Sequence, residues 1–153
     1  DTGLFIKPGL WGNLPAGEGS IGPIESTAEG QLVFDGALAE VELDQPIIIT
    51  IKKGQAIKIS GGEAAKILQA QIEKVGPMAG QIGELGIGTN PLARLSPNIL
   101  EAEKVYGTCH IALGNNQSYG GIINVPFHSD GLIKSPILTI DGRVIVRDNK
   151  VVI

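Results

Sequence analysis

The sequence has few of the residues on which several classes of protein depend. Its single cysteine, Cys109, excludes an internal disulfide and a thiolate metal cage, and it is compatible with a reducing compartment, for which the cytoplasm is the default. Aromatic residues make up 4% of the chain and the net charge is −4. Because nucleic-acid binding requires a basic surface and rings that stack on bases, we do not expect a nucleic-acid partner.

Long hydrophobic runs are also missing. The longest stretch without a charged residue, residues 105–129, contains Asn115, Asn116 and Gln117, which do not belong in a bilayer, so no membrane span is expected. The 153 residues are 42% hydrophobic, which predicts one domain with its own core. The chain begins without Met or a leader and is therefore interpreted as part of a longer, two-domain protein.

Turn signals are frequent in the sequence, whereas helical patterns are rare. Apolar runs separated by Asp-Gly, Lys-Gly or Asp-Asn predict hairpins in residues 31–41, 46–60 and 137–153, and glycine-rich connectors are expected at residues 13–23 and 83–91. One apolar face predicts a main helix over Glu63–Val75, within about 62–75, and residues 98–105 permit a short one. We therefore expect a β-rich α+β fold with curved antiparallel or mixed sheets.

The segment FHSDGLI, residues 127–133, places a histidine and an aspartate on one face of an expected strand. His128 and Asp130 are two residues apart, and alternate side chains of a strand point to the same side. Such a pair can be a buried hydrogen-bonded pair, a catalytic dyad or two ligands of one metal ion. This segment alone leaves the three interpretations open.

Three further residues lie in similar apolar or glycine-rich surroundings: Glu18, Glu84 and His110. Taken singly, each has an ordinary structural explanation, such as a turn carboxylate, a salt bridge or a satisfied core histidine. Together with His128 and Asp130 they form a mixed nitrogen and oxygen set. Such a set suits Zn²⁺, Co²⁺, Mn²⁺ or Fe²⁺.

Four motifs in this order resemble the metal-binding segments of the aminopeptidase T family, the M29-type metallo-aminopeptidases: NLPAGE, GELGIGTNP, CHIALG and HSD. The resemblance covers nearly the whole chain and corresponds to the C-terminal, metal-bearing part of that family, whose N-terminal domain is expected as a missing partner. It implies a hydrolase of the leucyl aminopeptidase kind acting on peptides, with two Zn, Co or Mn ions held by Glu18, Glu84, His110, His128 and Asp130.

The same resemblance implies catalytic roles for Glu18 and Tyr119. The family has a tyrosine soon after the first histidine, and Tyr119 in NNQSYGG is the nearest match here. The HSD motif lacks the apolar continuation typical of the family. Enzymatic activity is expected of the longer chain, and apolar surface exposed in this part predicts a dimer or other homo-oligomer.

A second family shares some of these residues. The 2,5-dihydroxypyridine dioxygenases resemble aminopeptidase T enzymes in sequence but hold one Fe(II) through two histidines and an aspartate, here His110, His128 and Asp130. The joint presence of Glu18 and Glu84 favours the two-metal interpretation. A non-catalytic fragment that has kept the fold is the third alternative.

Overall fold

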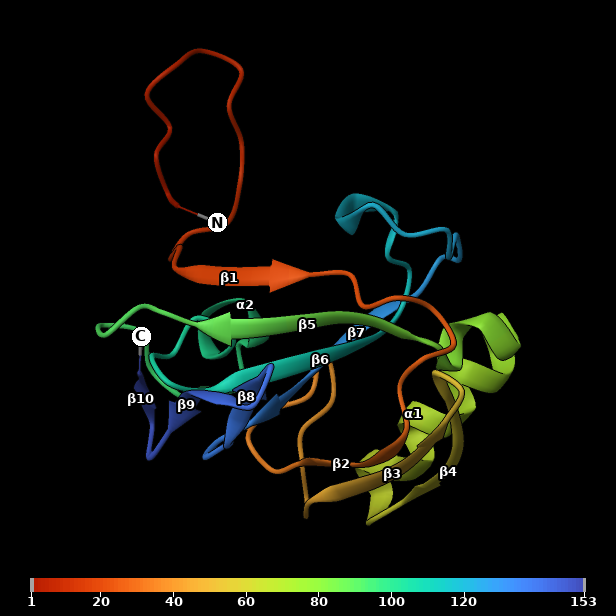
Figure 1. Ribbon diagram of the computed structural model, residues 1–153. Coiled ribbons are helices and arrows are strands. Elements are labelled where there is room, and N and C mark those ends of the chain that lie inside the picture. The colour runs from red at the N-terminus through yellow and green to blue at the C-terminus, as the bar shows by residue number, and fades with distance from the viewer. Residues whose placement is uncertain (1, 153) are drawn as a thin grey trace.

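The computed structural model describes residues 2–152, and these form a β-rich α+β fold with three antiparallel sheets and one main helix (Figure 1), which confirms the predicted fold class. The helical elements are α1 (Glu63–Val75), α2 (Ile99–Ala102) and the 3-10 turns η1 (Pro77–Gly80) and η2 (Gln117–Tyr119). The strands are β1 (Glu18–Ile21), β2 (Gly30–Phe34), β3 (Ile47–Lys52), β4 (Gln55–Ser60), β5 (Ile82–Gly88), β6 (Cys109–Gly114), β7 (His128–Ile133), β8 (Leu138–Ile140), β9 (Arg143–Arg147) and β10 (Lys150–Val151).

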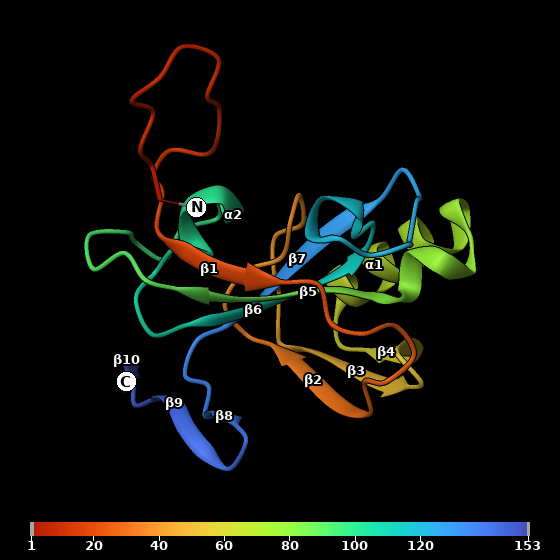
Figure 2. The ribbon, with the colours of Figure 1, turned by 45° about the horizontal axis from the view of Figure 1, so that its top comes forward.

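The largest sheet has the order β1-β5-β6-β7, and the others are β2-β3-β4 and β10-β9-β8. The glycine-rich segment 83–91, predicted as a connector, instead supplies β5 in the middle of this sheet. Its glycines allow close packing, because a Cβ atom on Gly83 would lie only 2.7 Å from the carbonyl oxygen of Gly114. Figures 1 and 2 show α1 at one end of this sheet and the β8–β10 sheet at the other.

Two of the three predicted hairpin regions are confirmed. Residues 46–60 form β3 and β4, and residues 137–153 contain β8, β9 and β10, although residue 153 lies outside the described residues. The hairpin predicted for residues 31–41 was wrong: β2 pairs with β3, and the chain then leaves the sheet at Asp35. The N–H groups of Asp35 and Gly36 both donate to the carbonyl of Leu132. These bonds carry the chain across to β7 in place of a second local strand.

The main core lies on one side of β6 and β7, between this sheet and the β2-β3-β4 sheet with α1. Phe34 is fully buried, and a Cβ atom on Gly131 of β7 would lie 2.2 Å from its ring. Helix α1 contributes Ala64, Ala65 and Leu68 to the core, as its apolar face predicted. The opposite face of the four-stranded sheet therefore remains for polar side chains.

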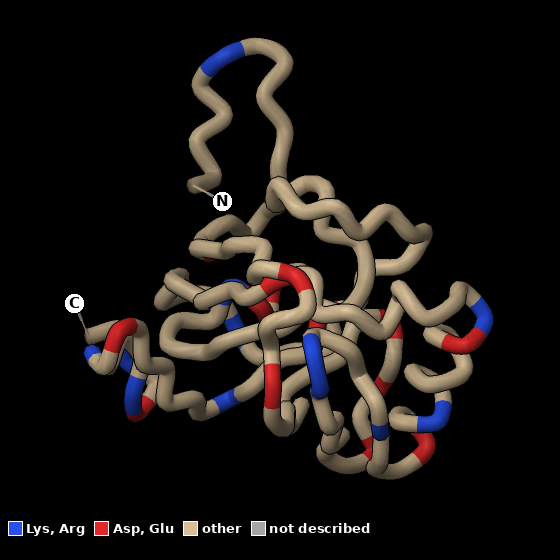
Figure 3. The backbone as a smooth tube through the Cα atoms, turned by 45° about the vertical axis from the view of Figure 1, so that its right-hand side comes forward, with Lys and Arg blue, Asp and Glu red and all other residues tan. Residues whose placement is uncertain are grey.

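The N-terminal segment extends away from the body of the protein as a loop (Figures 2 and 3). Its apolar side chains include Ile6, Trp11 and Leu14, which are 78%, 91% and 72% exposed. Within residues 2–17, Lys7 is the only charged residue. Exposed apolar surface is thus present, and homo-oligomerisation stays a prediction. No helix within residues 2–152 is long and apolar enough to cross a membrane.

Candidate metal centre

The register of the four-stranded sheet places all five predicted ligand residues on one face. Glu84 pairs with Ala112, and Ala112 pairs with Asp130, so these three residues lie in one row across β5, β6 and β7. His110 and His128 are two residues from members of this row. Glu18 pairs with Gly88, which lies four residues along β5 from Glu84 and therefore on the same face. Since pairs and alternate residues share a face, the five side chains converge, as the alternation of His128 and Asp130 predicted for one pair.

Small residues between these side chains leave room for them. The partner of His110 on β5 is Gly86, and the partner of His128 on β6 is Gly114. A Cβ atom on Gly86 would lie 1.9 Å from Nε2 of His110. The imidazole of His110 therefore occupies the space that a side chain at residue 86 would need.

Glu84 lies between the two histidines. Its Oε1 is 3.5 Å from Nε2 of His110, and its Oε2 is 3.2 Å from Nε2 of His128. Burial would raise the pKa of Glu84, but hydrogen bonds with both histidines and with Tyr119 outweigh it and hold the pKa well below its usual range. Glu84 is therefore an ionised carboxylate inside the protein.

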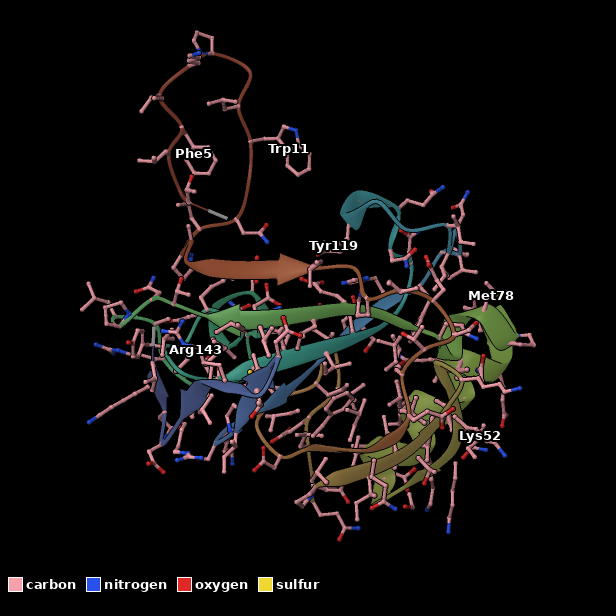
Figure 4. The ribbon with its side chains drawn as sticks, in the orientation of Figure 1. Phe5, Trp11, Lys52, Met78, Tyr119 and Arg143 are labelled. Atoms are coloured by element: carbon pink, nitrogen blue, oxygen red, sulfur yellow. The ribbon has the colours of Figure 1, made fainter. Side chains whose placement is uncertain are left out.

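His128 is the more accessible of the two histidines. Its Nδ1 lies 2.7 Å from the carbonyl oxygen of Asn115, which leaves Nε2 to face Glu84 and Asp130. Tyr119 stacks on its ring at a centroid distance of 5.9 Å, and Figure 4 shows Tyr119 beside the end of β1. Burial raises the pKa of the Tyr119 hydroxyl, and Glu84 raises it further, so Tyr119 remains protonated at neutral pH.

His110 is completely buried, and its nitrogens are poorly satisfied. Its Nε2 lies 3.4 Å from Oε2 of Glu18, but within the described residues neither ring nitrogen has a hydrogen-bond partner of good geometry. Oδ1 of Asp130 is likewise buried without such a partner, although it lies 3.5 Å from Nε2 of His128. Because buried polar atoms are nearly always paired, these atoms fit a bound cation.

Three overlapping groups among residues 2–152 bring possible ligand atoms within 4.8 Å of one another, and each group mixes histidine and carboxylate. They are Glu18, Glu84 and His110; Glu84, His128 and Asp130; and Glu103, His110 and Asp130. The set therefore suits a divalent ion that prefers nitrogen and oxygen ligands.

Two residues of this site were missed by the sequence analysis: Glu103 and Lys104. Both are buried just after α2, and Lys104 Nζ lies 2.9 Å from Oε1 of Glu18 and also contacts Glu103. Burial alone would lower the pKa of Lys104, but the hydrogen bonds that it donates to Glu103 and Glu18 outweigh burial and raise the pKa. A Glu-Lys pair at the end of a short helix is typical of a solvated surface, so no sequence pattern marked these two residues.

A cavity of about 890 Å³ adjoins the site at His128 and Tyr119. Its walls combine aromatic, amide and basic side chains, among them Phe127, Asn115, Gln71 and Lys74. A concave space of this size, lined by a few polar groups beside ionisable residues, is typical of small-molecule binding sites.

The comparisons with known proteins identify the family. A model of the 2,5-dihydroxypyridine 5,6-dioxygenase family matches residues 1–153, which is the full chain. The chain belongs to this family. A curated member, the 2,5-dihydroxypyridine 5,6-dioxygenase of Pseudomonas putida strain KT2440, is 27% identical over 168 residues, covering 99% of this chain and 47% of the relative. The chain thus spans about half the length of the dioxygenase that it matches.

A solved structure supports the same relationship. The structure of 2,5-dihydroxypyridine dioxygenase from Pseudomonas putida KT2440 superimposes on 86% of this chain and 42% of that chain, with a TM-score of 0.78 and 26% identity. The fold of the chain is therefore that of part of a dioxygenase.

These findings correct the interpretation as an M29-type aminopeptidase. The metallopeptidase function, the peptide substrate and the pair of Zn or Co ions were wrong as predictions, because the family match and both relatives are dioxygenases. The motifs could not discriminate, because His110, His128 and Asp130 serve both interpretations. The assignment of Glu18 and Glu84 as metal ligands stays a prediction, and both residues belong to the groups of possible ligand atoms described above.

We predict that metal affinity depends on pH through the protonation of His128. Burial would lower the pKa of His128, but contacts with Asp130 and Glu84 outweigh burial and raise the pKa to about 10 from 6.5. A metal must displace this proton, so we expect affinity to rise about tenfold per pH unit between pH 7 and 9. Competitive Mn²⁺ titration against a chelator of known protonation behaviour measures this rise.

The same shift has the opposite effect on the stability of the apoprotein. Because the folded pKa lies above the unfolded value, the stabilisation from protonated His128 is complete below about pH 6.5 and is lost as the pH rises through about 10. We therefore expect this contribution to fall with pH while metal affinity increases. A metal affinity that is flat from pH 7 to 9 would show that His128 is not a ligand.

Proposed function

We propose that the chain is the metal-bearing part of a dioxygenase that cleaves a hydroxylated pyridine and holds one Fe(II) ion. The observation that carries this proposal is the convergence of two histidines and Asp130 on one face of the sheet, in a chain that the dioxygenase family model matches throughout. Two histidines and one carboxylate are the set typical of non-haem Fe(II) oxygenases.

His110, His128 and Asp130 are the proposed ligands. The buried Nε2 of His110 and Oδ1 of Asp130 have no hydrogen-bond partner of good geometry among the described residues, so both are available to a cation. When bound, Fe(II) supplies the activation of O₂ beside an oxygen-bearing ring. The contact of His128 Nδ1 with the Asn115 carbonyl fixes its ring so that Nε2 faces the site.

Glu84, Tyr119 and the cavity wall are placed to bind and orient the substrate. Glu84 is ionised and lies beside both histidines, so its carboxylate is placed to accept a hydrogen bond from a ring hydroxyl. Tyr119 keeps its proton and is placed to donate a hydrogen bond. The cavity next to His128 is lined by Phe127 and Tyr119, whose rings suit a planar aromatic substrate.

The test uses anaerobic loading with Fe(II). We expect one iron per chain, binding of 2,5-dihydroxypyridine by calorimetry under nitrogen, and O₂ uptake with loss of the pyridine absorbance when air is admitted. Aminoacyl anilides supplied with Co²⁺, Zn²⁺ or Mn²⁺ serve as the control and should remain intact. Two metals per chain, or no binding of the pyridine, would refute the proposal, and neither measurement depends on turnover.

A further inference from the structure

Lys104 reaches the centre of the site because the backbone that follows α2 packs directly on β5. The N–H of Asn90 donates to the Lys104 carbonyl at 2.8 Å. A Cβ atom on Gly88 would lie 2.0 Å from the carbonyl oxygen of Val105, so glycine is required there for this approach. The result is an ammonium group with no exposed surface on its side chain, beside the carboxylates of the metal centre.

The ammonium group contacts two of the three carboxylates that the proposed iron ligands do not include. Nζ of Lys104 lies 2.9 Å from Oε1 of Glu18, and it also contacts Oε1 of Glu103. The other oxygen of Glu18, Oε2, lies 3.4 Å from Nε2 of His110. The Glu18 carboxylate therefore has the proposed iron ligand on one side and a cation on the other, as a carboxylate between two metal ions would.

The buried carboxylates of this site require a compensating positive charge. Four acidic side chains meet here, Glu18, Glu84, Glu103 and Asp130, and a buried charge is costly unless a partner compensates it. In a two-metal site the second ion would compensate Glu18 and Glu103. Here a lysine of fixed position does so.

We propose that the ammonium group of Lys104 occupies the place of a second metal ion and restricts the site to one divalent ion. This inference rests on the proposed function, which requires a single iron. It also explains how a chain with Glu18 and Glu84 in metal-binding motifs belongs to a family of dioxygenases.

The test is the metal stoichiometry of Lys104→Met, which keeps an unbranched side chain, one atom shorter, and removes its charge. We expect Lys104→Met to bind two Mn²⁺ per chain, where the unmodified chain binds one. Electron paramagnetic resonance should then change from the six lines of an isolated Mn²⁺ to the more numerous, closely spaced lines of a spin-coupled pair. The control is Lys66→Met, which removes an exposed lysine paired with Glu63 at 2.9 Å and should leave one ion.

The outcomes separate this inference from the proposed function. One ion in both the unmodified chain and a folded Lys104→Met overturns the inference and leaves the single-iron proposal intact. Two ions in the unmodified chain overturn both. If circular dichroism shows that Lys104→Met does not fold, the double variant Lys104→Met with Glu103→Gln is used, because it removes the carboxylate charge left without a partner. A second ion bound by the double variant supports the inference. A single ion overturns it.

Discussion

Replacing Asp130 with asparagine is expected to lower the affinity for Fe(II) by more than about 100-fold and to abolish O₂ uptake. Loss of a residue that only orients a metal ligand costs about 10–100-fold in affinity, and loss of a ligand charge should exceed this. The substitution keeps the shape of the side chain, and Asp130 Oδ1 has no good hydrogen bond to lose among the described residues. Anaerobic iron titration measures the affinity, and an oxygen electrode measures the uptake.

Asp141→Asn is the matched control. Asp141 lies in the turn between β8 and β9 with φ of 49°, a left-handed conformation that asparagine also adopts readily. We expect this variant to bind iron as the unmodified chain does. Equal losses in both variants, or an Asp130→Asn variant with unchanged iron affinity, would show that Asp130 is not a ligand.

The sequence predicted the parts of the structure that depend on local rules. The hairpin turns at Lys53-Gly54 and Asp141-Gly142 have positive φ at both residues, which is the requirement that makes such pairs recognisable. The apolar face of Glu63–Val75 marked the helix because the helical repeat of apolar residues is also a pattern within one short segment. Its start is fixed less locally, because the Asp44 carboxylate, distant in sequence, accepts hydrogen bonds from the N–H groups of Glu63 and Ala64.

Long-range pairing decided the parts that the sequence did not predict. Asp35-Gly36 has the composition of a hairpin turn, yet both N–H groups bond to Leu132 of a distant strand. Lys104 and Glu103 enter the metal centre only because glycine at residue 88 lets the backbone approach β5. Neither relationship leaves a periodic pattern, so local analysis could not find them.

Five residues of the candidate site were predictable from the sequence, but the reaction that they support was not. The alternation of His128 and Asp130 placed two of its members on one face, and the structure brings Glu18, Glu84 and His110 to the same face. The choice between hydrolase and dioxygenase depends on which carboxylates bind metal. Glu18 has one oxygen against Lys104, a contact between residues far apart in sequence.

Gly86→Ala tests the geometry of the site at the contact between residue 86 and the imidazole of His110. The new Cβ atom would lie 1.9 Å from Nε2 and 2.1 Å from Cε1 of His110, so the buried imidazole must move. We expect the displacement to remove His110 from the metal and lower iron affinity by more than about 100-fold, again beyond the cost of losing an orienting residue. Overpacking should also lower the free energy of unfolding by about 1–3 kcal/mol, which urea denaturation of the apoprotein measures.

Gly19→Ala is the control for Gly86→Ala, because both residues lie in strands of the same sheet. A Cβ atom on Gly19 meets nothing within 4 Å, so stability and iron affinity should stay close to those of the unmodified chain. Iron binding by Gly86→Ala at full affinity would mean that the metal does not need His110 in this position. A protein that is only destabilised would still bind iron while it is folded. If folded Gly86→Ala instead binds iron weakly, the pairing of Gly86 with His110 is the feature that aligns this ligand.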